Sequence, residues 1–391
     1  MSSQERNARE PSCAKLRSKV SSPHAARRGN DRYRCDPSRC FFGSNRRAPR
    51  APLTNRAASM KLSQLGEFGL IETIRAATPK GRGVRLGIGD DAAWVEHPGR
   101  SSLITADLLI EGVHFDLRWT TLFDLGFKSL AVNLSDIAAM GGVPAYLILS
   151  LGIPADFDSK QIAEFYRGIG SLAAPSGVAL IGGDTNLAEK FLISVCVLGH
   201  APYRPIPRSG ARVGDDIYVT GQLGDAALAL TFLKNKKSAK RPDLLTRLLE
   251  RHHRPTPRLA IGARLARDRL ATAMIDVSDG LMQDLGHICE ASGVGAAIAC
   301  DNIPVSQAYR ALSGRARMGY ALTGGEDYEL LFCAPPRQRQ RIERLARRTK
   351  VAITRIGRCV TAKEKITVFS DSGRQVDVTA GGHDHFRTSK R

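Results

Sequence analysis

Five short segments of the chain set aspartate beside glycine or directly after a run of apolar residues. They are Gly89-Asp90-Asp91, Thr105-Ala106-Asp107, Asn133-Leu134-Ser135-Asp136, Gly182-Gly183-Asp184-Thr185 and Asp276-Val277-Ser278-Asp279-Gly280. Carboxylates gathered in one place repel one another unless several cations lie between them. Because Mg²⁺ prefers oxygen ligands and usually reaches a protein together with phosphates, these segments predict a polynuclear Mg²⁺–nucleotide site.

Each segment alone also has a simpler interpretation. The segment at 89–91 fits a solvated hairpin turn, and Ser278 or Asp279 fits the N-cap of a following helix. Asp136 lies in an otherwise apolar helix, where a carboxylate is exposed, caps another group or binds a ligand. Residues 182–185 end an apolar run and fit a metal or phosphate loop. The combination of segments favours the metal site.

The length of 391 residues allows two domains, and the formal net charge of +20 is unevenly distributed. Residues 1–59 hold 14 Lys/Arg against four Asp/Glu, which is half of the positive excess. Their composition is typical of a disordered segment. Three interpretations stay open: a basic tail that binds acidic partners, an organelle transit peptide, or an upstream extension with Met60 as the true start, which we favour.

The cysteines and the apolar runs indicate the compartment. Eight cysteines lie at positions 13, 35, 40, 196, 289, 300, 333 and 359, and none forms a Cys-x-x-Cys pair. The last five have apolar surroundings and predict buried free thiols of a reducing compartment. The longest apolar stretch, residues 143–153, is far shorter than the ~20 residues of a membrane span. We therefore expect a cytoplasmic protein that does not enter a membrane.

Helical and strand-like periods alternate in both halves and predict an α/β (α+β) fold. In the first half we expect strands at 84–88, 92–95, 102–106, 145–151, 178–181 and 191–198, and helices at 122–140 and 159–173. In the second half we expect strands at 217–220, 273–275, 296–299, 328–333 and 352–356, and helices at 225–234, 258–267 and 281–291. A basic connection is expected between the first two of these helices. Pro202, Pro205 and Pro207 mark a linker, which predicts domains over 60–203 and 204–391.

A P-loop is absent from the sequence, because no segment carries its Gly-Lys pair and upstream glycine. Residues 168–173 match a dinucleotide fingerprint, but they fall inside a predicted helix and not at a strand-to-helix turn. A nucleotide must therefore be held by metal ions and by another kind of loop.

Together, these segments resemble the thiamine-monophosphate kinase family over residues 66–386. The matching segments are Gly66-Glu67-Phe68 with Leu70-Ile71, 86–91, 131–140, 180–185, Arg208-Ser209-Gly210, 275–281, Asp284-Leu285-Gly286-His287 and 324–330. The resemblance implies the two-domain fold of aminoimidazole-ribonucleotide synthetase, dimerising through the sheet of the N-terminal domain. It also implies ATP-dependent conversion of thiamine monophosphate to thiamine diphosphate with several Mg²⁺ ions.

The resemblance assigns roles position by position. The implied Mg²⁺ ligands are Asp91, Thr105, Asp107, Asp136, Asp184, Asp276 and Asp279. The implied ATP contacts are Tyr166, Gly183, Asp184, Arg208 and Ser278. The implied contacts to thiamine monophosphate are His114, Glu326 and His383.

Two positions depart from the family pattern. Members of the family often have Thr at the position of Ala106, beside the metal-binding Asp107. Alanine has no hydroxyl, so a side-chain ligand is lost there. His383 replaces a Trp or Tyr, and we expect its smaller ring to bind the cationic thiazolium more weakly.

The implied acceptor oxygen is already anionic at neutral pH, so we expect neither a general base nor a covalent nucleophile. The barrier is repulsion between two phosphates and their alignment, which bridging Mg²⁺ ions relieve. Lys128 or Arg208 could add positive charge, although a lone basic residue on a helix is usually solvated.

Two other functions stay open. One is a different ATP-using enzyme of the same fold, such as selenophosphate synthetase or aminoimidazole-ribonucleotide synthetase. Selenophosphate synthetase would need a reactive cysteine before the first strand, and residues 60–83 contain none. The other is nucleic-acid binding, which the positive net charge permits. The body of the chain, however, lacks the interleaved aromatic residues that such proteins use.

Overall fold

The structure is a computed structural model that describes residues 69, 71–72, 83–97, 100–236, 238–314, 318–370 and 372–376. The predicted disorder of residues 1–59, the three cysteines found there and the predicted contact at His383 lie outside the described residues. The proposed division of the chain near residue 204 stays a prediction.

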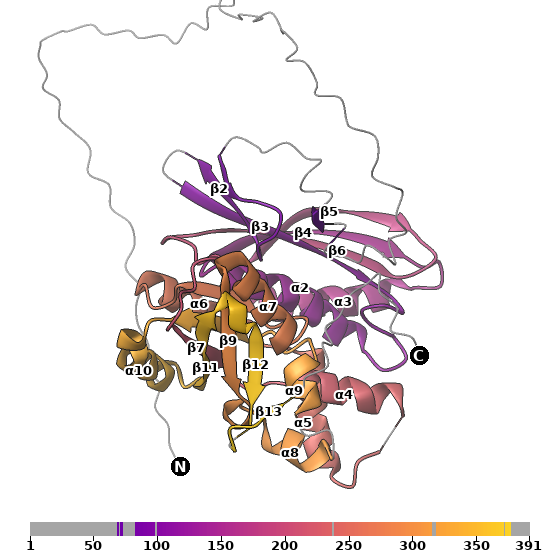
Figure 1. The fold of residues 1–391 in the computed structure, drawn as a ribbon. Helices are drawn as coiled ribbons and strands as arrows, with labels where there is room; N and C mark the ends of the chain where they lie inside the picture. The colour runs from indigo at the N-terminus through magenta and orange to yellow at the C-terminus, as the bar shows by residue number, and fades with distance from the viewer. Residues whose placement is uncertain are drawn as a thin grey trace, which may run out of the picture. The chain divides into compact units, whose positions relative to one another are not determined.

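The first half of the chain forms a six-stranded sheet in the order β1-β2-β3-β6-β4-β5. Its strands are β1 (Val84–Leu86), β2 (Ala93–His97), β3 (Arg100–Ile110), β4 (Val143–Ile153), β5 (Ala179–Leu187) and β6 (Leu192–His200). Neighbouring strands are antiparallel except β4 and β5. Two helices, α2 (Leu122–Ala139) and α3 (Ser159–Ser176), cover one face of this sheet and share its hydrophobic core (Figure 1).

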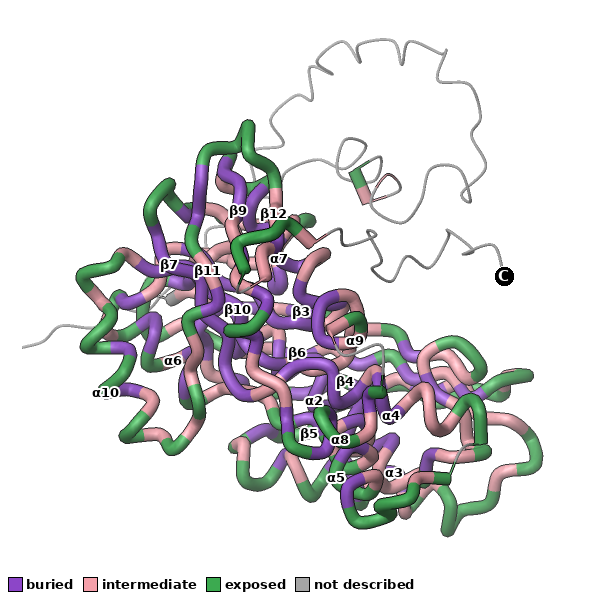
Figure 2. The backbone as a smooth tube through the Cα atoms, turned by 60° about the horizontal axis from the view of Figure 1, so that its bottom comes forward, coloured by how far each residue is buried: buried purple, intermediate pink, exposed green. Residues whose placement is uncertain are grey.

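The second half forms a seven-stranded sheet in the order β13-β12-β9-β11-β7-β10-β8. Its strands are β7 (Asp216–Thr220), β8 (Ala273–Asp276), β9 (Val294–Ala299), β10 (Leu330–Ala334), β11 (Ile353–Thr361), β12 (Ile366–Phe369) and β13 (Gln375–Val376). Only β9 and β12 pair in parallel within the described sheet. Every residue of β7 and β10 is buried, so these strands form the centre of the second core (Figure 2).

Seven described helices accompany the second sheet. They are α4 (Asp225–Lys234), α5 (Pro242–His253), α6 (Leu259–Arg267), α7 (Leu281–Ser292), α8 (Gln307–Leu312), α9 (Gly319–Thr323) and α10 (Arg339–Thr349). Helix α10 buries Ile342 and Leu345 in a cluster that also contains residues of α6 and β10.

Helix α2 packs closely against one helix of each half of the described structure, at positions occupied by glycine. A Cβ atom at Gly126 would lie 2.0 Å from the carbonyl oxygen of Phe165 in α3. At the other end, a Cβ atom at Gly262 of α6 would lie 2.0 Å from the carbonyl oxygen of Ala138. Glycine at these places lets the helix backbones approach closely. As a result, α2 belongs to the packing of both sheets.

The predicted elements are largely confirmed, with two corrections. Helices at 122–140 and 225–234 match α2 and α4. The basic connection contains the helix α5, whose buried residues Leu244, Leu248 and His252 recur every four positions among charged neighbours. Residues 182–185 are not a loop that ends a strand, because they lie within β5. Glycine is required at position 183, because a Cβ atom there would lie 1.8 Å from the carbonyl oxygen of Leu149 in the neighbouring strand.

The cysteine prediction is confirmed for four of the five cysteines in the described part. Cys289, Cys300, Cys333 and Cys359 are buried free thiols, whereas Cys196 is a free thiol that is half-buried. Among the described residues, the helices are too short or too polar to cross a membrane.

The close contact between α2 and α3 gives a stability prediction. Replacing Gly126 with Ala forces a methyl group into the backbone of Phe165. We expect the free energy of unfolding to fall by about 1–3 kcal/mol. The control is Gly170→Ala, because a Cβ atom at this exposed position of α3 has no atom within 4 Å. The control should be neutral or more stable by up to ~1 kcal/mol. Urea unfolding measures both, and equal stabilities would contradict the contact.

Candidate metal and nucleotide site

Three of the predicted ligands come together from both halves of the chain. Carboxylate oxygens of Asp91, Asp136 and Asp276 all lie within 4.8 Å of one another. Asp91 lies in the turn before β2, Asp136 lies in α2, and Asp276 ends β8. The side chain of Asp91 is fully buried, and Asp276 is 2% exposed. We call this group the carboxylate triad.

Burial and repulsion by neighbouring carboxylates disfavour the charged forms of Asp136, Asp276 and the nearby Asp107. Burial, followed by the charges of Asp107 and Asp276, raises the pKa of Asp136 well above its ordinary value. Burial and the charge of Asp91 raise the pKa of Asp276 to about 8. Asp107, half-buried in β3, has its pKa raised to about 6 by burial. A bound cation would favour the ionised form of all these groups.

The donors around the triad hold some of its oxygens and leave one without a partner. The Thr105 hydroxyl donates to Asp136 Oδ2 at 2.6 Å, and the Ser135 hydroxyl donates to Asp276 Oδ2 at 2.6 Å. Asp91 Oδ2 is buried and has no hydrogen-bond partner among the described residues. A buried acceptor without a donor is costly, so this oxygen fits a cation that prefers oxygen ligands, such as Mg²⁺.

Arg208 supplies positive charge beside the triad. Its Nη2 atom lies 2.9 Å from Asp91 Oδ1, and its backbone N–H donates to Asp90 Oδ2 at 3.2 Å. Burial alone would lower the pKa of Arg208, but the Asp91 carboxylate and its hydrogen bond hold it above the ordinary value. The buried Nε atom has no partner among the residues described. This guanidinium therefore retains a donor for an anionic ligand.

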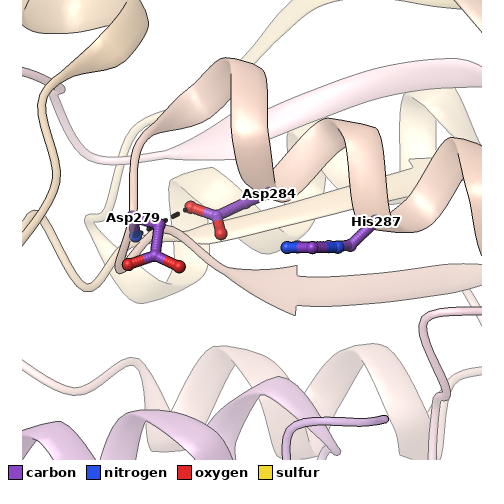
Figure 3. A group of neighbouring side chains, drawn as sticks. All are labelled: Asp279, Asp284 and His287. Carbon is purple, nitrogen blue, oxygen red and sulfur yellow. Dashed lines mark hydrogen bonds between the residues drawn. The ribbon is translucent and has the colours of Figure 1, made fainter. Parts of the chain in front are cut away.

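A second acidic group lies at the start of α7. Ligand atoms of Asp279, Asp284 and His287 lie within 4.8 Å of one another, and Figure 3 shows them along this helix. Asp284 Oδ2 accepts the backbone N–H of Asp279 at 3.2 Å and that of Gly280 at 3.0 Å. Buried Asp284 therefore fixes the turn that carries Asp279. In the same turn, the half-buried Ser278 accepts the Glu326 N–H at its carbonyl oxygen, at 2.7 Å.

Asp184 and Gly183 are not brought to the triad. They lie in β5, which β6 and β4 separate from β3. Three strand spacings correspond to roughly 14 Å. The Asp184 carboxylate instead accepts the Thr185 N–H at 2.8 Å and the Asn186 side-chain amide at 2.7 Å. Their predicted roles stay predictions.

The remaining predicted residues have other surroundings. Tyr166 packs on the core of the first sheet, with its ring 5.8 Å from that of Phe165. His114 Nδ1 accepts the Ile110 N–H at 3.0 Å, which leaves the proton of a neutral ring on Nε2. Glu326 lies beside Lys128 and His252.

Sequence reasoning missed several residues of this region. Asp90 holds the backbone of Arg208, Ser135 holds Asp276, and Asp284 and His287 accompany Asp279. Asp90 and Ser135 adjoin predicted ligands, so adjacency was an available signal. Asp284 follows Gly280 by four positions at the start of a helix, which is the spacing of a carboxylate that accepts free N–H groups of a first turn.

Comparisons with known proteins agree with the two halves of the described structure. The sequence model of the family described as AIR synthase related protein, N-terminal domain, matches residues 89–201. That of the corresponding C-terminal domain matches residues 212–370.

Several relatives carry the same name. Thiamine-monophosphate kinase of Salmonella typhimurium is 40% identical over 327 residues, which is 83% of this chain and 99% of the relative. The enzyme of Bacillus subtilis is 34% identical over 328 residues, 83% of this chain and 100% of the relative. The solved structure described as AaThiL complexed with AMPPCP and TMP has a TM-score of 0.72 and 35% identity, covering 84% of this chain and 99% of the other.

The raised pKa of Asp276 gives a prediction for the metal-free protein. The folded chain keeps a proton that the unfolded chain loses at its pKa of 3.8, so this group's contribution to stability falls as pH rises from about 4 to about 8. Asp276→Asn removes the effect. We expect the melting temperature of this variant in EDTA to exceed that of wild type by an amount that grows between pH 5 and 8.

Mg²⁺ should then raise the melting temperature of wild type more than that of Asp276→Asn, because it binds only the folded triad. The control is Asp156→Asn, a substitution at an exposed position. Its melting temperature should respond to pH and to Mg²⁺ as that of wild type does. A pH-independent difference between Asp276→Asn and wild type would contradict the repulsion.

Proposed function

We propose that this chain, which belongs to the thiamine-monophosphate kinase family, transfers the terminal phosphoryl group of ATP directly to thiamine monophosphate and forms thiamine diphosphate on a polynuclear Mg²⁺ site. The observation that carries the proposal is the carboxylate triad with its unpartnered Asp91 oxygen. A group of buried carboxylates whose ionised forms are disfavoured is suited to cations and not to stability.

The chemistry of the donors supports Mg²⁺. Asp91, Asp136 and Asp276 would hold it, with Asp107, Thr105 and Asp279 as further oxygen ligands, and Asp184 as a ligand carried over from the family. When bound, the ions would neutralise charge on the phosphate groups. The Thr105 hydroxyl donates a hydrogen bond to Asp136, so its oxygen keeps lone pairs for a ligand.

Other residues of the chain position the two substrates. The free Nε–H of Arg208 is suited to a phosphate of ATP, and Ser278 lies in the turn beside Asp279. We keep Tyr166 and Gly183 as nucleotide contacts, and His114, Glu326 and His383 as contacts to thiamine monophosphate. A general base is not needed, because the accepting phosphate oxygen is already anionic. The described residues work by charge and alignment.

We also propose a homodimer that forms through the first sheet. The sheet face opposite α2 and α3 carries exposed apolar residues on several strands, and all nine residues of the edge strand β5 are exposed. On that face they are Leu108, Tyr146 and Ile148, and the edge strand β5 itself exposes Leu180, Ile181 and Leu187. An exposed apolar face beside an unpaired edge strand favours association with a second sheet. A second copy of the chain supplies a matching face by symmetry.

A reducing cytoplasm remains the proposed location. Free thiols support it, since Cys333 Sγ and Cys359 Sγ lie 3.6 Å apart without a covalent bond. Detection of a disulfide between them in protein taken directly from cells would contradict it.

The proposed reaction is tested by incubating the full chain with thiamine monophosphate, ATP and Mg²⁺ and measuring thiamine diphosphate by chromatography. We expect product only when Mg²⁺ is present. Asp136→Asn and Asp184→Asn should each lower turnover by roughly a hundredfold or more, because each removes an anionic ligand. The control Asp156→Asn should retain normal turnover. If both ligand variants turn over normally at saturating Mg²⁺, these residues are not primary ligands; if wild type forms no product, the proposed reaction is wrong.

The proposed dimer is tested by sedimentation equilibrium. Wild type should have twice the 42.4-kDa mass of the chain. Ile181→Asp sets a charge on the open apolar face and should shift the mass to that of the monomer, because burying an unpaired charge is costly. Val213→Asp makes the same kind of change at an exposed residue of the connection between the sheets and should leave the mass unchanged. A monomeric wild type would contradict the dimer.

A further inference from the structure

A buried ionic group joins the two halves of the chain next to the carboxylate triad. Lys128 Nζ of α2 lies 2.7 Å from Glu326 Oε1, and His252 Nδ1 of α5 lies 3.2 Å from Glu326 Oε2. Lys128 and His252 are each 4% exposed. We call these three residues the Lys128–Glu326 group. Its members lie on two helices and a loop, and 198 positions separate Lys128 from Glu326.

The charges of this group balance inside the protein. Burial and the Lys128 charge lower the pKa of His252, against the opposing effect of Glu326, so the imidazole is neutral near pH 7. Burial on its own would raise the pKa of Glu326, but the charges and hydrogen bonds of Lys128 and His252 together hold it below its ordinary value. Glu326 is therefore an anion paired with one cation. Removal of Lys128 would leave the partly buried Glu326 carboxylate, whose side chain is 26% exposed, without its counter-charge, which costs free energy.

The loop that carries Glu326 needs such an anchor. Glu326 has φ of 71° and Tyr328 has φ of 49°, a left-handed conformation that costs free energy in residues other than glycine. The same loop is bound to the turn of Asp276–Gly280, because the Tyr328 N–H donates to the Val277 carbonyl at 2.8 Å. The position of Glu326 is thus set by contacts on both sides and not by local preference.

Helix α2 carries this anchor on the same face as two residues of the metal site. Ser135 and Asp136 follow Lys128 by seven and eight positions, which is about two helical turns. Ser135 donates to Asp276, and Lys128 pairs with Glu326. One helix of the first half therefore holds both the metal turn and the Glu326 loop of the second half.

We propose that Lys128 is a positioning residue for thiamine monophosphate: with His252 beside it, Lys128 fixes the Glu326 carboxylate in the orientation that receives this substrate. The inference rests on the proposed function, which assigns Glu326 to that substrate. Lys128 itself need not touch the substrate, since Glu326 holds its ammonium group.

Steady-state kinetics of the full chain test this role. Lys128→Met should raise the KM for thiamine monophosphate roughly ten- to a hundredfold, with smaller effects on kcat and on the KM for ATP. Lys128→Arg keeps the charge and should recover part of the loss. Glu326→Gln alone should also raise the KM, and adding Lys128→Met to it should change the KM by less than about twofold. A merely structural lysine would not produce this dependence on Glu326.

The matched control is Lys160→Met, the same change at an exposed lysine of α3. Because Lys128→Met leaves Glu326 unpaired, its melting temperature should fall and should recover in the double variant with Glu326→Gln. Hydrogen exchange at residues 324–328 should be faster in Lys128→Met than in wild type or Lys160→Met. This readout does not depend on activity.

The outcomes separate the inference from the proposed function. If wild type forms thiamine diphosphate but Lys128→Met has an unchanged KM, or raises it equally with and without Glu326→Gln, the inference is overturned and the function stands. If wild type forms no thiamine diphosphate, the proposed function fails and the substrate role of Lys128 fails with it. In that case faster exchange in Lys128→Met still supports the anchor of the loop, and unchanged exchange overturns it as well.

Discussion

Repulsion among buried carboxylates is the constraint on which the rest of this structure depends. Asp91, Asp136 and Asp276 reach one place from a turn, a helix and a strand, and burial disfavours the ionised forms of Asp136 and Asp276. Such a group lowers stability, so well-packed elements must hold it. The backbone of α2 meets α3 at Gly126 and meets α6 at Gly262. Both sheets are thereby fixed to the helix that carries Asp136.

The charge of the triad is only partly neutralised by its neighbours. Arg208 pairs with Asp91 and binds Asp90 through its backbone, but it is a single positive charge beside several carboxylates. More arginines would stabilise the folded chain and would also occupy the oxygens that a metal needs. Beside several carboxylates, one guanidinium leaves the net charge of the site negative, which suits a cation. The Nε–H of Arg208, which has no partner among the described residues, suits a phosphate.

The sequence predicted elements where one physical preference dominates. Helix α2 was predictable from its apolar period and its glycine stop, and the carboxylate triad from repeated carboxylates at strand and helix ends. Helix α5 was missed because arginines surround its buried stripe, which includes a histidine. Residues 182–185 were interpreted as a loop because glycine often ends a strand, although it also occurs within a strand where another backbone approaches closely. The distance of Asp184 from the triad depends on strand order, which local patterns do not contain.

The same limit applies to Lys128, for which sequence reasoning preferred a solvated side chain. A lysine in a helix is solvated unless a second body covers it, and its partner Glu326 lies 198 positions away. What the sequence does contain is the spacing of Lys128, Ser135 and Asp136 on one helical face. A polar face on a helix whose other side is apolar normally meets water. In α2 it meets the second half of the chain, where Lys128 pairs with Glu326 and Ser135 donates to Asp276, while Asp136 joins the triad. Polar residues buried this way fix how the two halves meet, and they hold the carboxylate triad and the Glu326 loop on one helix.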